Sequence, residues 1–131
     1  MYELEITRFA PSPSTETHTA ETAISAIVLV NAICDDEYVI IAGRIENGYA
    51  CGDFLVWCNQ GRACVRLNTD HSIDGTVPAA SITHGATTLF RDTAGGSFSV
   101  DVARTISERQ ARTALQHWFL TGEMTTLLMW S

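Results

Sequence analysis

The feature that most constrains the fold is a hairpin pattern in residues Asp53–Leu67. Two apolar-rich stretches flank Asn59-Gln60-Gly61, and Gly61 can adopt the positive φ that a three-residue loop with a bulge needs. With that loop, one face carries Leu55, Trp57, Ala63, Val65 and Leu67, and the other carries Phe54, Val56, Cys58, Arg62, Cys64 and Arg66. We expect the first face to point into the core. The hairpin predicts an antiparallel sheet.

Further strands are predicted on both sides of this hairpin. Residues Tyr2–Phe9 alternate apolar and polar side chains, as a half-buried strand does, and Tyr38–Ala42 is typical of a buried strand. Residues Thr87–Arg91 and Ser97–Ala103 form a second hairpin pattern around a glycine-containing loop.

Three segments are expected to lie between these strands without a long regular element. The prolines near residues 11 and 13 indicate a loop after the first strand. Residues Ile45–Gly52 indicate a loop or a short hairpin, and the polar stretch Asn68–Gly85 a long loop.

Two helices are predicted. The first begins near Thr19, with Thr19 as N-cap and Glu21 in the first turn, although Ile27–Ile33 is equally compatible with a strand. The second begins at a capping box formed by Ser107 and Gln110 and ends at Gly122. Its apolar face consists of Ala111, Ala114, Leu115, Trp118 and Phe119.

These elements predict one α+β domain over residues 1–131, with a mostly antiparallel sheet of about five or six strands and both helices packed on it. The apolar tail, which contains Leu127, Leu128 and Trp130, is expected to pack on the sheet or the helix.

The net charge and the first residues of the sequence indicate which partners and which cellular location to expect. The fifteen acidic residues outnumber the eight basic ones, all arginine, and the formal net charge of −7 disfavours nucleic acid and anionic membranes as partners. The first residues contain Glu3 and Glu5 but no basic stretch, so we expect no signal peptide, and the run Ala23–Cys34 is too short to span a bilayer. We therefore expect a cytoplasmic protein.

Residues suited to catalysis are few. The four cysteines lack C-x-x-C spacing and are expected to be reduced thiols, and no nucleophile elbow, phosphate-binding loop or H-E-x-x-H motif occurs. A metal site or an acid/base pair can be assembled only from Asp70, His71, Asp74 and His84, which we interpret in the first place as a polar surface loop. We expect no enzyme activity, cofactor or metal, and keep a small metal-dependent enzyme or ligand-binding subunit as the alternative.

Residues Ile106–Trp130 resemble the closing segment of the type one Imm family of bacterial polymorphic-toxin immunity proteins. The matching positions are Ser107 at the helix start, Trp118 with Phe119, Thr121 with Gly122, and Trp130. Thr125 stands where the family usually has proline. The resemblance implies a protein that binds and neutralises a cognate toxin, often a deaminase that acts on nucleic acid, and it implies that these residues determine the fold and do not contact the toxin.

A toxin that acts on nucleic acid needs a positive groove, which an acidic protein can cover. We expect the contacts to be acids in or beside loops, namely Asp35, Asp36, Glu37, Asp70, Asp74 and Asp92. A third possibility is a self-associating structural protein that uses its apolar tail, in which case Trp130→Ala disrupts the dimer.

Overall fold

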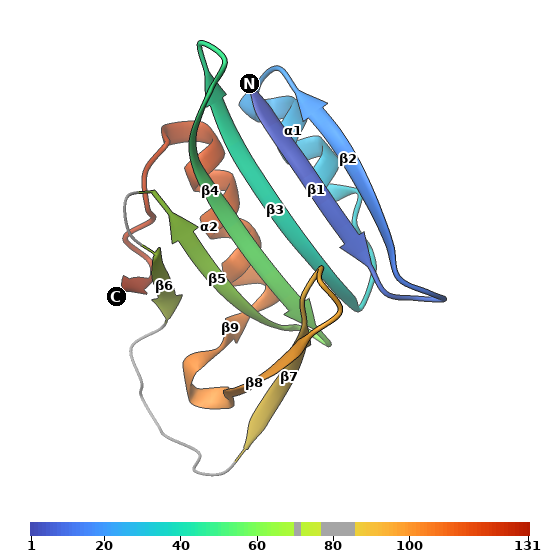
Figure 1. Cartoon of the computed structure of the whole chain (residues 1–131). Helices are drawn as coiled ribbons and strands as arrows, with labels where there is room; N and C mark the ends of the chain where they lie inside the picture. Colours follow the sequence, from blue (N-terminus) through green and yellow to red (C-terminus); the bar gives the residue numbers. More distant parts are fainter. Residues whose placement is uncertain (70–71, 77–85) are drawn as a thin grey trace.

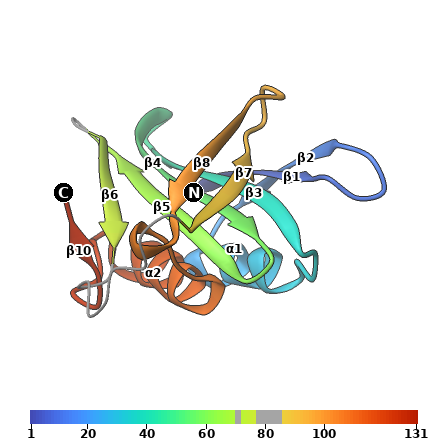
Figure 2. The same ribbon diagram turned by 90° about the horizontal axis from the view of Figure 1, so that it is seen from below.

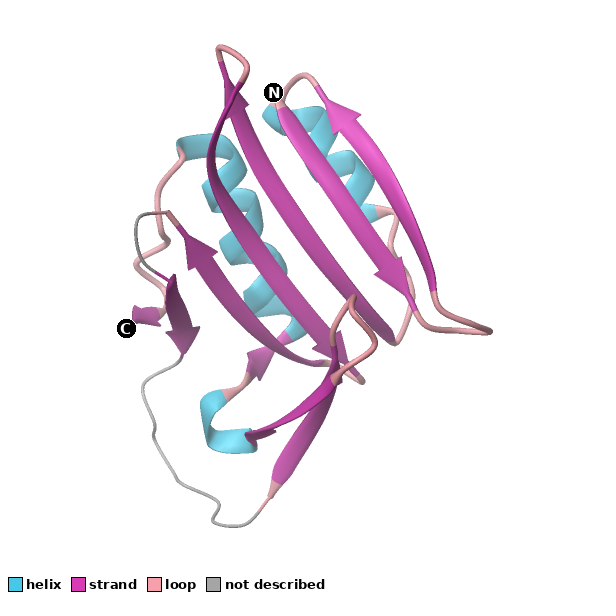
Figure 3. Cartoon of the chain, viewed as in Figure 1, coloured by secondary structure: helices cyan, strands magenta, loops and turns pink. Residues whose placement is uncertain are grey.

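A computed structural model describes residues 1–69, 72–76 and 86–131 of the chain. Its main feature is an antiparallel sheet with two helices on one face (Figures 1 and 3). The elements are β1 (Tyr2–Arg8), β2 (Ser14–Ala20), α1 (Ala23–Asn31), β3 (Glu37–Glu46), β4 (Tyr49–Asn59), β5 (Arg62–Asn68), β6 (Ser72–Thr76), β7 (Thr87–Arg91), β8 (Ser97–Asp101), the 3-10 turn η1 (Val102–Arg104), β9 (Ile106–Ser107), α2 (Glu108–Thr121) and β10 (Met129–Trp130).

The strand order of the main sheet is β10-β6-β5-β4-β3-β1-β2, and β9 pairs with the free part of β5. Strands β7 and β8 form a separate two-stranded sheet. The α+β class and the mostly antiparallel sheet are confirmed, but the main sheet has eight strands where five or six were expected. The extra strands are short or polar, and such segments give little periodic signal in a sequence.

The core lies between the sheet and the two helices. Alternate residues of the central strands point to this side and are buried, including Leu4, Ile40, Phe54 and Val65. The apolar face of α2 covers them, with Phe54 and Trp118 at a ring-centroid distance of 5.7 Å. The buried residues predicted on this helix, Ala111, Ala114, Leu115, Trp118 and Phe119, are all confirmed.

The predicted inward face of the β4–β5 hairpin is wrong. Asn59 pairs with Arg62, so the turn has two residues, Gln60 and Gly61, both with positive φ (48° and 82°). We had assumed a three-residue loop, and a one-residue change in register moves one strand's side chains to the opposite face. The inward face consists of Phe54, Val56, Cys58, Ala63, Val65 and Leu67.

The beginning of the first helix also differs from the prediction. Residues Ser14–Ala20 form β2, and the helix starts after Thr22, whose side chain forms a capping box with Ser25. Thr19 is therefore not the N-cap, and Glu21 precedes the helix. The alternating threonines of β2 favour a strand because β-branched residues fit the pleated backbone. Residues Ala23–Asn31 are helical, which excludes the strand alternative for most of Ile27–Ile33.

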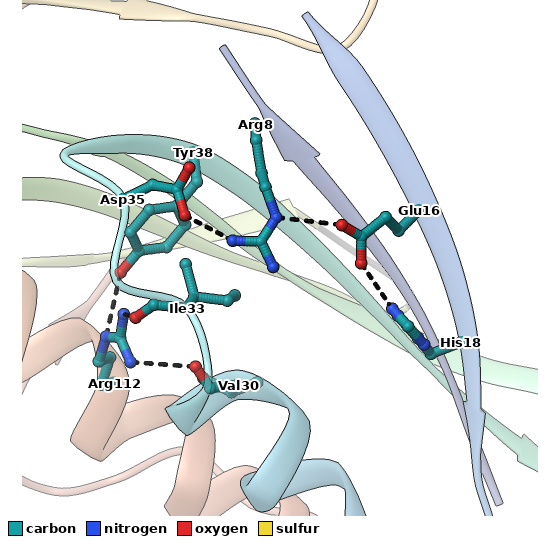
Figure 4. Close-up of polar contacts among 8 residues, drawn as sticks. All are labelled: Arg8, Glu16, His18, Val30, Ile33, Asp35, Tyr38 and Arg112. Carbon is teal, nitrogen blue, oxygen red and sulfur yellow. Dashed lines mark hydrogen bonds and ion pairs between the residues drawn. The ribbon is translucent and has the colours of Figure 1, made fainter. Parts of the chain in front are cut away.

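A half-buried arginine connects the two helices to the sheet (Figure 4). Arg112 of α2 donates hydrogen bonds to the carbonyl oxygens of Val30 and Ile33 at the end of α1, and to the hydroxyl of Tyr38 on β3. Burial raises the pKa of Tyr38, so its hydroxyl stays protonated. The guanidinium thus satisfies carbonyls that a helix end leaves without intrahelical partners.

The predicted ends of α2 are confirmed. The capping box of Ser107 and Gln110 is present, and Gly122 ends the helix with φ 74°. Beyond it, Leu128 is buried and Trp130 packs edge-on against Phe54, but Leu127 is 71% exposed, so the expectation that it packs is wrong. The tail pairs with β6, a strand within the segment Asn68–Gly85 that we had predicted to be a loop.

The β7–β8 hairpin lies on the side of the sheet opposite the helices, as Figure 2 shows. Phe90 of β7 is buried, and the rings of Trp57 on β4 and Phe98 on β8 meet edge to face at 5.6 Å. An Arg91–Glu37 ion pair joins the hairpin to β3. The second strand ends at Asp101, earlier than predicted, because its carboxylate accepts a hydrogen bond from the Ala103 N–H and begins η1.

Candidate functional site: the open face of the sheet

The sheet has one face that neither helix covers, and we call its side chains the open face. They come from the residues that alternate with the core positions on each strand. Across β1, β3 and β4 the rows are Glu3–Gly43–Asp53, Glu5–Ile41–Leu55 and Thr7–Val39–Trp57. The β7–β8 hairpin shields the third row, and the first two rows lie beyond it (Figure 1).

The centre of the open face is apolar. Ile41 and Leu55 are neighbours on paired strands and are half-buried, as is Trp57 in the next row. Phe98 of the hairpin contacts Trp57, and neither helix lies on this side of the sheet. A partner that covers Ile41 and Leu55 removes apolar surface from water, which favours binding.

Carboxylates border this apolar centre. Glu3 and Glu5 lie on β1, and Asp53 lies on β4 beyond Gly43. Within the described ranges, none of the three forms an ion pair or a side-chain hydrogen bond. Because Gly43 has no side chain, the Asp53 carboxylate can lie close to it: a Cβ added at Gly43 would be only 3.1 Å from Asp53 Oδ1. This end of the face therefore carries uncompensated negative charge.

A groove continues from the apolar centre to the other end of the face. It has a volume of about 540 Å³ and lies between β4–β6 and the β8–η1 segment, with the contacting rings of Trp57 and Phe98 in its lining. Arg66 and Asp74 line it as an ion pair, with Nε donating to Oδ1 at 2.8 Å. Asp74, one of the predicted contacts, is thus engaged within the chain, and it leaves Arg66 little net charge to offer an anion.

The thiol in this groove is a poor nucleophile. Burial raises the pKa of Cys64 to about 11, with a further contribution from Asp74. On the helix side, burial and a hydrogen bond to Glu108 raise the pKa of Cys58 to about 12. Both groups are thiols at neutral pH, and only the thiolate attacks electrophiles efficiently.

The acids predicted to contact a partner are mostly used inside the molecule. Asp35 accepts a hydrogen bond from Arg8 (Figure 4), and Glu37 forms a bidentate pair with Arg91. The Asp92 carboxylate accepts a hydrogen bond from the Ala94 N–H. Asp36 is exposed, and within the described part of the chain its side chain forms no ion pair.

The residues of the alternative metal site are largely beyond reach of the structure. Asp70, His71 and His84 lie outside the described residues, and only Asp74 can be placed. Among the residues that are described, no group of three or more His, Cys, Asp or Glu side chains is arranged to hold a metal ion. The same residues contain no helix that is both long and apolar enough to cross a membrane.

The residues that carry the family resemblance lie at helix ends or pack within the fold. Ser107 caps α2, Trp118 and Phe119 are buried in the core, and Gly122 ends the helix. Thr121 donates to the carbonyl of His117. Trp130 is partly buried, and its indole N–H donates to the carbonyl of Thr125, the residue at the position where proline was expected.

We did not predict the open-face acids as contact residues from the sequence, although the strand pattern indicated which face they occupy. The alternation that predicts β1 places Glu3 and Glu5 opposite the core residues Tyr2, Leu4 and Ile6. For Asp53 the signal was ambiguous, because assigning its face requires the correct hairpin register.

Comparisons with known proteins do not identify a family. No protein-family model matches the chain, and no curated protein matches it significantly. The resemblance to the type one Imm proteins therefore stays a prediction.

Proposed function

We propose that this chain is a cytoplasmic immunity protein that binds a cognate bacterial toxin, in particular a deaminase acting on nucleic acid, and occludes its active site or substrate groove without catalysis. The observation that carries this proposal is the open face, whose apolar centre is bordered by Glu3, Glu5 and Asp53 without ion-pair partners in the described chain. An enzyme that acts on nucleic acid presents cationic side chains to the phosphates, and the same side chains can pair with the carboxylates around the apolar centre.

The proposal also explains why a half-buried apolar strip without a covering helix is tolerated. Interfaces between proteins commonly have a desolvated apolar centre and a polar rim, and the open face has this arrangement. The net charge of −7 adds long-range attraction to a basic partner. We therefore place the main contacts on the open face and retain Asp36 as a loop contact.

Co-expression with the toxin encoded beside this gene tests the function. Cells that express the toxin domain alone should stop growing, and the wild-type chain should restore growth and co-purify with the toxin. If the purified chain neither binds nor protects against any neighbouring toxin, the proposal is wrong.

Matched charge reversals test the surface. Glu3→Lys/Glu5→Lys should weaken toxin binding by roughly 30-fold or more, because it places cations opposite cations. Glu21→Lys/Glu123→Lys changes the net charge equally at exposed positions off the open face and should change the affinity less than about 3-fold. Equal loss in both variants would assign the effect to net charge and contradict a contact at the open face. Asp36→Lys separately tests the predicted loop contact.

A further inference from the structure

The edge strand β2 has its outer backbone groups free. Met1 exchanges backbone hydrogen bonds with Ile45, so the polar groups of Met1 face β3. Because these groups point alternately to either side along a strand, those of Tyr2, Leu4, Ile6 and Arg8 face β2. Their partners on β2 are Ala20, His18, Glu16 and Ser14, which leaves the N–H and C=O groups of Thr15, Thr17 and Thr19 directed away from the sheet.

This edge lacks several of the features that usually prevent pairing with another strand, namely lysine or proline on the edge, a bulge, or a very short strand. Its one carboxylate, Glu16, is already bonded to Arg8 and His18 of the same copy. The chain has no lysine, and β2 pairs with β1 through seven residues without a register shift. The opposite edge, β10, has two residues. Among the described strands of the main sheet, β2 is thus the long edge open to a further strand.

The sequence of β2 is complementary to itself. If two copies pair antiparallel about Thr17, Thr15 of one copy faces Thr19 of the other, so the outward backbone groups meet as hydrogen-bonded pairs. Glu16 of one copy then faces His18 of the second copy, and cross-strand Thr–Thr pairs are favourable. A slip of the register by one residue, which would pair Thr17 with Glu16 or His18, would bring outward groups against inward ones and break the ladder.

The first helix gives an independent reason to expect a second copy. α1 is apolar on nearly all sides, yet Ile24 and Val28 are each 63% exposed. Helices that are apolar all round are usually covered. α1 lies behind β1 and β2 in Figure 1, close to the open edge.

A two-fold axis at Thr17 keeps the helix layers of both copies on the same side of the joined sheet. Strands pair at about 4.8 Å and α1 contacts both β1 and β2, so the α1 helices of the two copies lie near the axis on the same side of the sheet. The two helices can then cover each other's apolar surface.

We propose that two copies of this chain form a symmetric dimer through antiparallel pairing of β2 about Thr17, with the α1 helices side by side. The open faces of the two copies stay uncovered and point to the same side of the continuous sheet. This proposal does not depend on the toxin-binding function, since it involves a different edge of the molecule.

Sedimentation equilibrium over roughly 1–100 μM protein tests the dimer. Wild-type chain should sediment as a dimer at the upper concentrations. Thr17→Pro should raise the dimer dissociation constant more than about 30-fold, because proline removes a central outward N–H while an edge position tolerates it in the monomer. The matched control Thr17→Ala keeps the backbone groups and should retain the dimer.

A second variant avoids any effect on the strand itself. Val28→Glu changes an exposed helix position and should also favour the monomer, with an unchanged circular dichroism spectrum. A wild-type chain that is monomeric throughout the range, or a dimer that Thr17→Pro and Val28→Glu leave unchanged, would overturn the proposal.

Discussion

At the scale of single residues, Arg112 shows how one side chain can connect three elements. Its side chain is 18% exposed, and its guanidinium donates to two carbonyls at the end of α1 and to Tyr38. The Val30 carbonyl also accepts a hydrogen bond from the Ile33 N–H, so the Ile33 carbonyl depends more strongly on Arg112. The planar, five-donor head suits this task better than the single ammonium of lysine.

We expect Arg112→Ala to lower the free energy of unfolding by about 2–4 kcal/mol, because it removes three hydrogen bonds and leaves the Ile33 carbonyl without its donor. Arg112→Lys should recover only part of the loss. Arg109, an exposed arginine on the same helix, provides the control, and Arg109→Ala should stay within about 0.5 kcal/mol of wild type. Urea denaturation followed by circular dichroism measures all three, and equal effects of the two alanine variants would contradict the bridging role.

The four cysteines should divide into two reactivity classes. Cys34 and Cys51 are exposed, whereas burial raises the pKa of Cys64 to about 11 and of Cys58 to about 12. With a pKa of 11, roughly one Cys64 in a thousand is a thiolate at pH 8, and the fraction increases tenfold per pH unit until the pKa is reached.

Ellman's reagent at pH 8 should therefore label two thiols rapidly in the native protein and all four after unfolding in guanidinium chloride. Cys34→Ser/Cys51→Ser should remove the fast phase. If that double variant still shows a fast native phase, Cys58 or Cys64 is more accessible or more acidic than the structure indicates.

At the scale of elements, the closing helix was predictable to the residue because its signals are local. The capping box, the apolar face and Gly122 each depend on neighbours within a few turns. The β4–β5 hairpin shows the opposite case. Its existence was predictable, but its register depends on whether Gln60 joins Gly61 in the turn, and that one residue decides whether Trp57 or Phe54 points into the core.

The short strands β6 and β10 were not predictable from local patterns. β6 pairs with β5, and β10 pairs with β6, so each depends on a neighbour distant in sequence. The same holds for the open face, because a surface without a covering helix is a property of the whole arrangement. Three of the six acids expected to contact a partner form internal ion pairs, which no sequence spacing reveals.

Gly75 tests how firmly the tail is held. A Cβ at this position would lie 2.8 Å from Val65 Cγ2 and 3.0 Å from Leu128 Cδ1, and 3.0 Å from the Trp130 ring. Gly75→Ala should therefore displace the tail and destabilise the fold by about 1–3 kcal/mol. Gly96→Ala, where the nearest atom would be at 3.6 Å, is the control.

Thermal denaturation and hydrogen exchange measure this effect. The amides of Asp74 and Ser131 bond to each other's carbonyls and should exchange faster in Gly75→Ala than in wild type. Unchanged protection of both amides would mean that the tail adapts to the added methyl group, in conflict with the close packing.

At the scale of the whole molecule, charge and shape act on different steps of binding. The net charge of −7 acts over a distance limited by salt, about 10 Å at 0.1 M, and so affects the rate of encounter. The apolar centre of the open face acts only at contact and affects mainly the lifetime of the complex. A toxin complex of this chain should show these two contributions separately.

Surface plasmon resonance of the chain with the toxin that we propose as its partner, at increasing NaCl, makes this a measurable prediction. Between about 20 and 500 mM salt the association rate constant should fall roughly tenfold or more, while the dissociation rate constant changes less than about threefold. Glu3→Gln/Glu5→Gln/Asp53→Asn should flatten the salt dependence of association, since it removes the unpaired carboxylates nearest the contact. Leu55→Ala should instead raise the dissociation rate and keep the wild-type salt dependence, because it removes apolar contact without changing charge. If the neutralised variant keeps the full salt dependence, the steering charge lies elsewhere on the surface, and the open face loses its electrostatic support as the toxin-binding site.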